Sequence, residues 1–345
     1  MLNEKILNTP VILFLGAGAS IPLGKPGMDT FVDNLKPSIV NQEESQLLTA
    51  LIQFRGKDLE LILGELDTLI GLSYADISAM VRQGNNTSHR VNLEPSVTEP
   101  LRDHIKHKII QEYRNIPDES VQTLYEPLFD RIFEQYGERI HCLPVFTTNY
   151  DRAIERFCSK NYETYELTDG FNYNVILRED TWNQEIFHSF HPVAGKRNIV
   201  LFKLHGSVDW VRDKTTDRIR RAPPMFDKLE EDAFQNVLIY PATAKIATAE
   251  PYFTAYTYYA RCCDRATLCL TIGYSFRDYD ALSRLRSSML LNEKLKLALL
   301  SPSSNKILEK LPLPQNRVKA LPFRFGDPTG SNDYLTAIQL AAITT

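Results

Sequence analysis

Seven short runs of apolar residues recur along the chain and predict the strands of a buried sheet. Each run is continuous rather than alternating, which is typical of parallel strands covered on both faces. Helical patterns lie between or after them, at residues 150–157, 279–291 and 333–343. Strands that alternate with helices predict an α/β protein with a Rossmann-like, doubly wound parallel sheet. The predicted strands cover residues 11–15, 143–147, 199–204, 237–240, 268–272, 295–300 and 318–321.

A long stretch from about residue 38 to residue 139 departs from this alternation. It shows helical patterns and no convincing strand. Within it, residues 58–69 are amphipathic, and residues 83–98 have the composition of a loop. We therefore expect a single domain over residues 1–345 with a helical insertion subdomain at about 38–139. The apolar face of the 58–69 helix consists of Leu59, Ile62, Leu63, Leu66 and Leu69.

The charge balance argues against two classes of partner. The 345 residues have a net charge of −4 and a pI near 6.0, which disfavours nucleic-acid wrapping or a polybasic membrane anchor as a property of the whole chain. A local basic cluster of Arg218, Arg220 and Arg221 is a solvated surface or, alternatively, a contact for a partner or nucleic acid. No apolar stretch approaches the roughly 20 residues needed to cross a bilayer, and the first residues lack a signal-peptide pattern. We expect a cytoplasmic protein without a membrane partner.

The cysteines predict no metal site. They are five in number and show no CxxC spacing, which suits reduced, buried thiols rather than a disulfide framework or a zinc site. His141 and Cys142 are adjacent, but two ligands do not complete a tetrahedral site. We therefore expect no bound metal.

Five short motifs each follow one of the apolar runs. Because the carboxyl ends of parallel strands lie at one edge of a sheet, where open α/β sheets bind ligands, we expect the motifs to lie together. The glycines of the first motif would let its backbone approach a pyrophosphate, although a tight turn without a ligand is the alternative. Its spacing is not GxGxxG and no acidic ribose partner is evident, which disfavours a hydride-transfer enzyme. The motifs are GAGAS (16–20), TTNYD (147–151), KLHGS (203–207), GYS (273–275) and SPSS (301–304).

Three polar side chains in these motifs are candidates for chemistry. Asn149 could hydrogen-bond a ribose hydroxyl or a water, and Asp151 could bind a ligand or N-cap the following helix. His205 precedes a Gly-Ser pair that permits a sharp turn, which we expect to expose the imidazole at the sheet edge. An imidazole with an unperturbed pKa of about 6.5 can act as a general base at neutral pH. The serines after the later strands could line an adenosine pocket, or form turns with Asp278 as a helix cap.

Taken in order, GAGAS, TTNYD, KLHGS and GYS resemble the motifs of the sirtuin-like superfamily of NAD-consuming proteins. The resemblance implies that Asn149 contacts the nicotinamide ribose, that Asp151 contacts nicotinamide, and that His205 is the catalytic base. Asn149 and His205 are thus the implied catalytic residues. Together with the reasoning from the strand ends, this makes the candidate NAD-binding residues Gly16, Ala17, Gly18, Ala19, Ser20, Asp151, Gly206, Gly273, Ser275 and Ser301.

Two departures from the family pattern indicate which branch of the family the chain resembles. The deacylating sirtuins have paired CxxC motifs after the HG, whereas residues 206–241 contain no cysteine. They also have a Phe-Arg pair after the first glycines, which residues 21–27 lack. The chain therefore resembles the sirtuin-like NADases of prokaryotic antiviral defence, a zinc-less branch. That resemblance implies an NAD⁺ glycohydrolase that releases nicotinamide and ADP-ribose.

The same resemblance implies assembly. It suggests a homo-oligomer, with a partner such as a HerA-type ATPase or a short Argonaute-type protein that gates activity. Tyr252, Tyr256 and Tyr259 lie at helical spacing and predict a core stripe or, alternatively, a subunit contact. Three other functions stay open: a catalytically silent NAD- or nucleotide-binding regulatory subunit, cyclisation or transfer of ADP-ribose, and a less favoured NAD-dependent protein deacylase.

Overall fold

The computed structural model describes residues 2–72, 93–175, 179–222, 234–238 and 249–327. The chain divides into two compact units. The first comprises Met1–Lys25, Arg114–Ile239 and Lys245–Thr345, and the second comprises Pro26–Tyr113 and Tyr240–Ala244. The predicted helix at 333–343 and most of the predicted loop at 83–98 lie outside the described residues.

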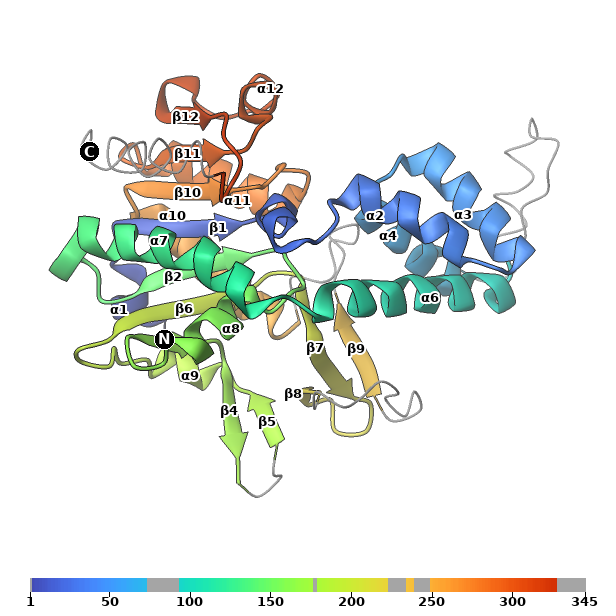
Figure 1. The fold of residues 1–345 in the computed structure, drawn as a ribbon, viewed down its shortest axis with the longest axis horizontal. Coiled ribbons are helices and arrows are strands. Elements are labelled where there is room, and N and C mark those ends of the chain that lie inside the picture. Colours follow the sequence, from blue (N-terminus) through green and yellow to red (C-terminus); the bar gives the residue numbers. More distant parts are fainter. Residues whose placement is uncertain (1, 73–92, 176–178, 223–233, 239–248, 328–345) are drawn as a thin grey trace. The chain divides into compact units, whose positions relative to one another are not determined.

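The first unit is built on a seven-stranded sheet whose neighbouring strands are all parallel. β1 lies between β10 and β2, and the strand order runs in opposite directions from this point (Figure 1). The expected Rossmann-like, doubly wound sheet is thus confirmed. In sheet order, its strands are β12 (Val318–Leu321), β11 (Lys296–Leu300), β10 (Leu268–Ile272), β1 (Val11–Leu15), β2 (Leu143–Thr147), β6 (Arg197–Lys203) and β3 (Tyr165–Thr168).

Successive side chains of β1 enter two different cores, which explains its unbroken apolar sequence. Leu13 and Leu15 pack in a cluster with α7 (Asp118–Tyr136) and α8 (Ala153–Lys160). Ile12 and Phe14 pack in a second cluster with helices on the other face of the sheet. Figure 1 shows α7 crossing one face. The second cluster draws on α1 (Glu4–Leu7), α9 (Glu185–His188), α10 (Tyr252–Arg265) and α11 (Tyr279–Leu291), and a short α12 (Ser304–Leu308) follows β11.

A second sheet in the same unit has five antiparallel strands and was not predicted. The apolar run at 237–240 was assigned to the parallel sheet, and this was wrong: its described part belongs to β9, which pairs with β7. An apolar run shows that a strand is buried but does not identify its neighbours. In sheet order the strands are β4 (Phe171–Asn174), β5 (Glu179–Trp182), β8 (Ile219–Arg221), β7 (Gly206–Asp213) and β9 (Phe234–Leu238).

The described part of the second unit is helical. The 58–69 pattern forms α4, whose five predicted core residues are all buried and whose first turn is capped by Asp58, accepting from the Leu61 N–H at 3.1 Å. α7 packs on the sheet of the first unit, so the compact helical unit ends at Tyr113 rather than near residue 139. Its helices are α2 (Met28–Leu35), α3 (Gln42–Arg55), α4 (Leu59–Gly71) and α6 (Pro95–Arg114).

No described helix has the length and apolar character required to cross a membrane. Short 3₁₀ turns complete the described elements. Two of these turns, η1 (Ala17–Ala19) and η2 (Ile21–Leu23), directly follow β1 and shape the loop that contains GAGAS. The others are η3 (Lys36–Ser38), η4 (Gly137–Arg139) and η6 (Gln315–Arg317).

Candidate active site

The five motifs lie at the carboxyl ends of β1, β2, β6, β10 and β11. These strands are parallel neighbours within one sheet, so their carboxyl ends lie along a common edge. The edge includes the point beside β1 where the strand order reverses, which is where open α/β sheets bind ligands.

The glycines of the first and fourth motifs pack backbone against backbone. The Gly18 N–H donates to the Gly273 carbonyl at 2.9 Å, and the Gly16 N–H donates to the Ile272 carbonyl at 2.9 Å. A Cβ on Gly18 would lie 2.7 Å from Gly273 Cα, and a Cβ on Gly273, where φ is +62°, would lie 2.4 Å from Ala19 N. The close approach of the two loops therefore requires these glycines whether or not a phosphate binds. Phosphate binding by GAGAS stays a prediction.

Asn149, Asp151 and Ser20 form one buried hydrogen-bonded cluster. The Ser20 hydroxyl donates to Asp151 Oδ2 at 2.5 Å and accepts from Asn149 Nδ2 at 3.0 Å. The other Asp151 oxygen accepts from the Ala153 N–H at 2.9 Å, at the start of α8. Asp151 therefore bonds the first residue of α8, whose N-cap is Arg152, and also anchors Ser20. Asn149 Oδ1 is buried and has no hydrogen-bond partner among the described residues.

His205 is held by a carboxylate from a distant part of the chain. Its Nε2 lies 3.0 Å from Asp278 Oδ2, which also accepts from the Tyr256 hydroxyl at 2.9 Å. The side chain of His205 is only 1% exposed, so the expectation of an exposed imidazole was wrong. The sharp turn is present, with Gly206 at φ +84°, but the ring is buried and bonded to Asp278, the N-cap of α11.

The charge state of Asp278 determines the tautomer of His205. Burial opposes ionisation, but the hydrogen bond and charge of His205, with the Ala281 N–H and Tyr256, outweigh it and hold the pKa of Asp278 below its usual range. An ionised carboxylate can only accept hydrogen bonds, so Nε2 must donate. A neutral His205 therefore has its lone pair on Nδ1.

Sequence reasoning missed this His205–Asp278–Tyr256 chain. It treated Asp278 only as a helix cap, which it also is: Oδ1 accepts from the N–H groups of Asp280 and Ala281 at 2.9 and 3.1 Å. The tyrosine stripe of α10 is buried, which confirms its core interpretation. No spacing signal links residues 205, 256 and 278, because only the folded arrangement brings them together.

The two predicted serines of the later motifs, Ser275 and Ser301, are not hydrogen-bonded to Asn149, Asp151 or His205 within the described part of the chain. Ser275 is exposed, whereas Ser301 is buried and its hydroxyl lies 3.2 Å from that of Ser303. All five cysteines are free and buried. Within the described ranges, no cluster of three or more His, Cys, Asp or Glu side chains is arranged to hold a metal ion.

Two arginines of the predicted basic cluster, Arg220 and Arg221, form ion pairs within the protein. Arg220 lies 2.8 Å from Glu179, and Arg221 pairs with Asp169. A second carboxylate, Asp209, lies 3.8 Å from Arg221. Arg220 and Arg221 are thus each balanced by a carboxylate within the protein.

Comparison with family models gives a match that lies almost entirely in the first unit. Residues 144–313 match the family model of the SIR2-like domain. This segment, just under half of the chain, is similar to that domain. The matched segment contains Asn149, His205 and Asp278, whereas GAGAS precedes it. No curated protein matches the sequence significantly.

Several solved structures resemble the whole chain at low sequence identity. A mutant Sir2 homologue in complex with 2′-O-acetyl-ADP-ribose is 15% identical, with 99% of this chain and 98% of that chain covered and a TM-score of 0.46. A Sir2 homologue in complex with NAD is 14% identical, with 99% and 95% covered and a TM-score of 0.46. A Sir2 protein bound to a propionylated peptide is 13% identical, with 97% and 94% covered and a TM-score of 0.42.

The lowered pKa of Asp278 predicts a pH-dependent contribution to stability. A carboxyl group whose folded pKa lies below its unfolded value of about 3.9 stabilises the fold above that pH, and the contribution is lost as the pH falls through the folded pKa. Relative to Asp278→Asn, the wild type should be more stable at neutral pH by on the order of 1 kcal/mol, and this gap should narrow below about pH 4. Urea unfolding of both proteins from neutral pH to below about pH 4 measures this difference in stability. A difference that stays constant over the range would contradict a lowered pKa for Asp278.

Proposed function

We propose that this SIR2-like domain binds NAD⁺ and hydrolyses its N-glycosidic bond, releasing nicotinamide and ADP-ribose. The observation that carries the proposal is the buried His205–Asp278 pair at the carboxyl edge of the sheet. A module that only binds a nucleotide has no need of a base backed by an ionised carboxylate. A hydrolase does, because water must lose a proton as it attacks.

The proposed step uses His205 as the base. Water forms a bond to the anomeric carbon of the nicotinamide ribose while the bond from that carbon to the pyridinium nitrogen breaks. The bonding electrons go to nicotinamide, which leaves as a neutral molecule and needs no acid catalyst. The proton from water goes to His205 Nδ1, and Asp278 stabilises the imidazolium that results.

Asn149 fits a role in holding the ribose. A buried acceptor without a hydrogen bond costs about 1–3 kcal/mol, and Asn149 Oδ1 is such an acceptor within the described structure. A ribose hydroxyl or the attacking water would satisfy it. Because Asn149 Nδ2 already donates to Ser20, the orientation of its amide is set before any ligand arrives.

We further propose that assembly controls this activity. The resemblance to the NADases of antiviral defence supports NAD depletion on infection, with a homo-oligomer gated by a HerA-type ATPase or a short Argonaute-type protein. The absence of the CxxC pairs from residues 206–241 disfavours deacylation. Cyclisation and ADP-ribosyl transfer share the bond-breaking step and differ only in the acceptor.

Nicotinamide release from NAD⁺ by the purified full-length chain tests the proposal, alone and with the product of the neighbouring gene. Wild type should release nicotinamide, and Asn149→Ala should lower kcat by on the order of 10²-fold because the ribose and the water lose their alignment. Asn198→Ala is the matched control, since Asn198 is also buried and, among the described residues, its side chain bonds the backbone of Val193 and Lys196. It should lose stability and keep its turnover.

Two outcomes would contradict the assignment. NAD⁺ binding without nicotinamide release under both conditions would indicate a silent binding module. Undiminished release by Asn149→Ala would remove Asn149 from the catalytic site while leaving the glycohydrolase activity in place.

A further inference from the structure

A buried ammonium group lies directly behind the loop that presents Asn149 and Asp151. Lys203, the last residue of β6, is only 3% exposed, and its partner Glu155 on α8 is 6% exposed. Lys203 Nζ lies 3.3 Å from Glu155 Oε1. Removing both charges from water is costly, and a buried pair of this kind is often no more stabilising than an apolar pair. Stability alone therefore does not explain why this ion pair is buried here.

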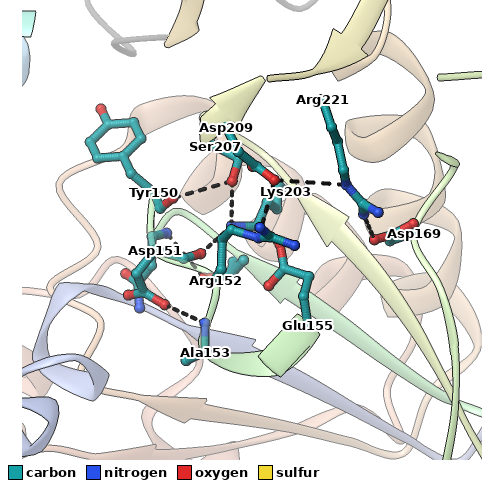
Figure 2. Close-up of polar contacts among 12 residues, drawn as sticks. Tyr150, Asp151, Arg152, Ala153, Glu155, Asp169, Lys203, Ser207, Asp209 and Arg221 are labelled. Atoms are coloured by element: carbon teal, nitrogen blue, oxygen red, sulfur yellow. Dashed lines mark hydrogen bonds and ion pairs between the residues drawn. The ribbon is translucent and has the colours of Figure 1, made fainter. Parts of the chain in front are cut away.

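The three donors of Lys203 reach three different parts of the site. Nζ donates to the backbone carbonyl of Asp151 and to Ser207 Oγ at 3.1 Å, in addition to its contact with Glu155. The Ser207 hydroxyl in turn donates to the Tyr150 carbonyl at 3.3 Å. Figure 2 shows these contacts converging on Lys203. An apolar side chain at residue 203 could make none of the three contacts of Nζ.

These contacts join the two segments that contain the proposed catalytic residues. Tyr150 and Asp151 directly follow Asn149, while Lys203 and Ser207 flank His205 on either side. The Val208 N–H also donates to the Tyr150 carbonyl, at 3.0 Å. The Lys203 ammonium thus holds the end of the Asn149 loop against the turn that contains His205.

A chain of ion pairs also holds the same loop. Arg152 Nε lies 3.1 Å from Asp209 Oδ2, and Asp209 also approaches Arg221, which pairs with Asp169 (Figure 2). Arg152 is the next residue after Asp151, and Asp209 lies on β7 beyond Ser207. The loop is therefore fixed to β6 and β7 at consecutive residues, from 150 to 152.

We propose that Lys203 is a positioning residue that aligns Asn149 with His205 and so sets the turnover of the domain without touching the substrate. This inference rests on the proposed function for its catalytic consequence. In geometric terms, the ammonium group is a side-chain link between two segments that the Leu204 and Val208 N–H groups also join, by donating to the Thr147 and Tyr150 carbonyls at 2.8 and 3.0 Å. Misplacing reacting groups by about 1 Å can cost on the order of 10²-fold in rate.

The test replaces the charged pair as a unit. Lys203→Met alone would leave Glu155 buried without its partner and could unfold the protein, so the variant is Lys203→Met/Glu155→Leu, which keeps the volume and removes both charges. It should fold with a melting temperature close to that of wild type and show a kcat lower by about 10- to 100-fold, with a smaller change in KM. Glu155→Gln retains the contacts of Lys203 with the loop and should keep a kcat within a few-fold of wild type.

A second ion pair in the same unit provides the matched control. Lys196 lies 2.8 Å from Glu166 and does not contact the loop, so Lys196→Met/Glu166→Leu should leave kcat unchanged. A folded Lys203→Met/Glu155→Leu protein with wild-type kcat would overturn the proposal.

The measurement separates this proposal from the proposed function. If wild type releases no nicotinamide, the glycohydrolase activity fails, and hydrogen exchange then decides the role of Lys203. Faster exchange of a peptide covering residues 148–153 in the double variant, with unchanged exchange in α11, would support positioning. Wild-type exchange there would overturn it.

Discussion

Asp278→Asn is expected to lower the kcat of nicotinamide release almost as much as His205→Ala, by on the order of 10²–10⁴-fold. Asp278 Oδ1 must remain an acceptor, because the Asp280 and Ala281 N–H groups point at it. In the asparagine variant the amide oxygen therefore takes that place and the NH₂ group faces His205. The amide then donates to Nε2, the imidazole proton moves to Nδ1, and the base loses the lone pair it needs.

This variant should lose turnover without losing its fold. Asparagine is a good N-cap, so α11 keeps its start, and the Tyr256 hydroxyl can rotate to accept from the new NH₂ group. Circular dichroism should therefore resemble that of wild type, and thermal unfolding should show only the stability loss of on the order of 1 kcal/mol expected above. If Asp278→Asn turns over at close to the wild-type rate, His205 does not act through Nδ1.

Two further variants show whether these residues act as one unit. Tyr256→Phe removes a single hydrogen bond to Asp278 and should reduce kcat by about 10-fold or less. The double variant His205→Ala/Asp278→Asn should be no slower than His205→Ala alone, since Asp278 has nothing to orient once the imidazole is gone. Additive losses would instead indicate that Asp278 contributes by a separate route.

The sheet was predictable because its strands are buried on both faces. A run such as VILFL in β1 places alternate side chains in two cores, so every position must be apolar. The antiparallel sheet was not predictable for the opposite reason. β4, β5 and β8 are short, contain charged or amide side chains and are only partly buried, so their sequences resemble loops until partners are assigned.

The candidate site was predictable in position but not in its internal contacts. Motifs at the ends of parallel strands must share an edge, and this places Asn149, Asp151 and His205 in one region from sequence alone. Asp278 and Lys203 were not recognised because the local sequence already explains each of them. Asp278 precedes a helix as its cap, and Lys203 ends a strand. Their importance comes from contacts with residues far away in sequence, such as His205 and Glu155.

Gly206→Ala is expected to destabilise the domain by about 3 kcal/mol or more. Gly206 has φ +84°, and a Cβ there would lie 2.0 Å from the Val237 carbonyl of the facing strand β9. The backbone at His205 would have to move to relieve this clash, so residual folded protein should also lose nicotinamide release. Gly195 is the matched control, because its φ is +77° and a Cβ there meets no atom within 4 Å. Gly195→Ala should lower the free energy of unfolding only by the left-handed strain of about 1 kcal/mol. Urea unfolding measures both variants. Equal losses of stability in the two would show that close packing against β9 does not fix the turn.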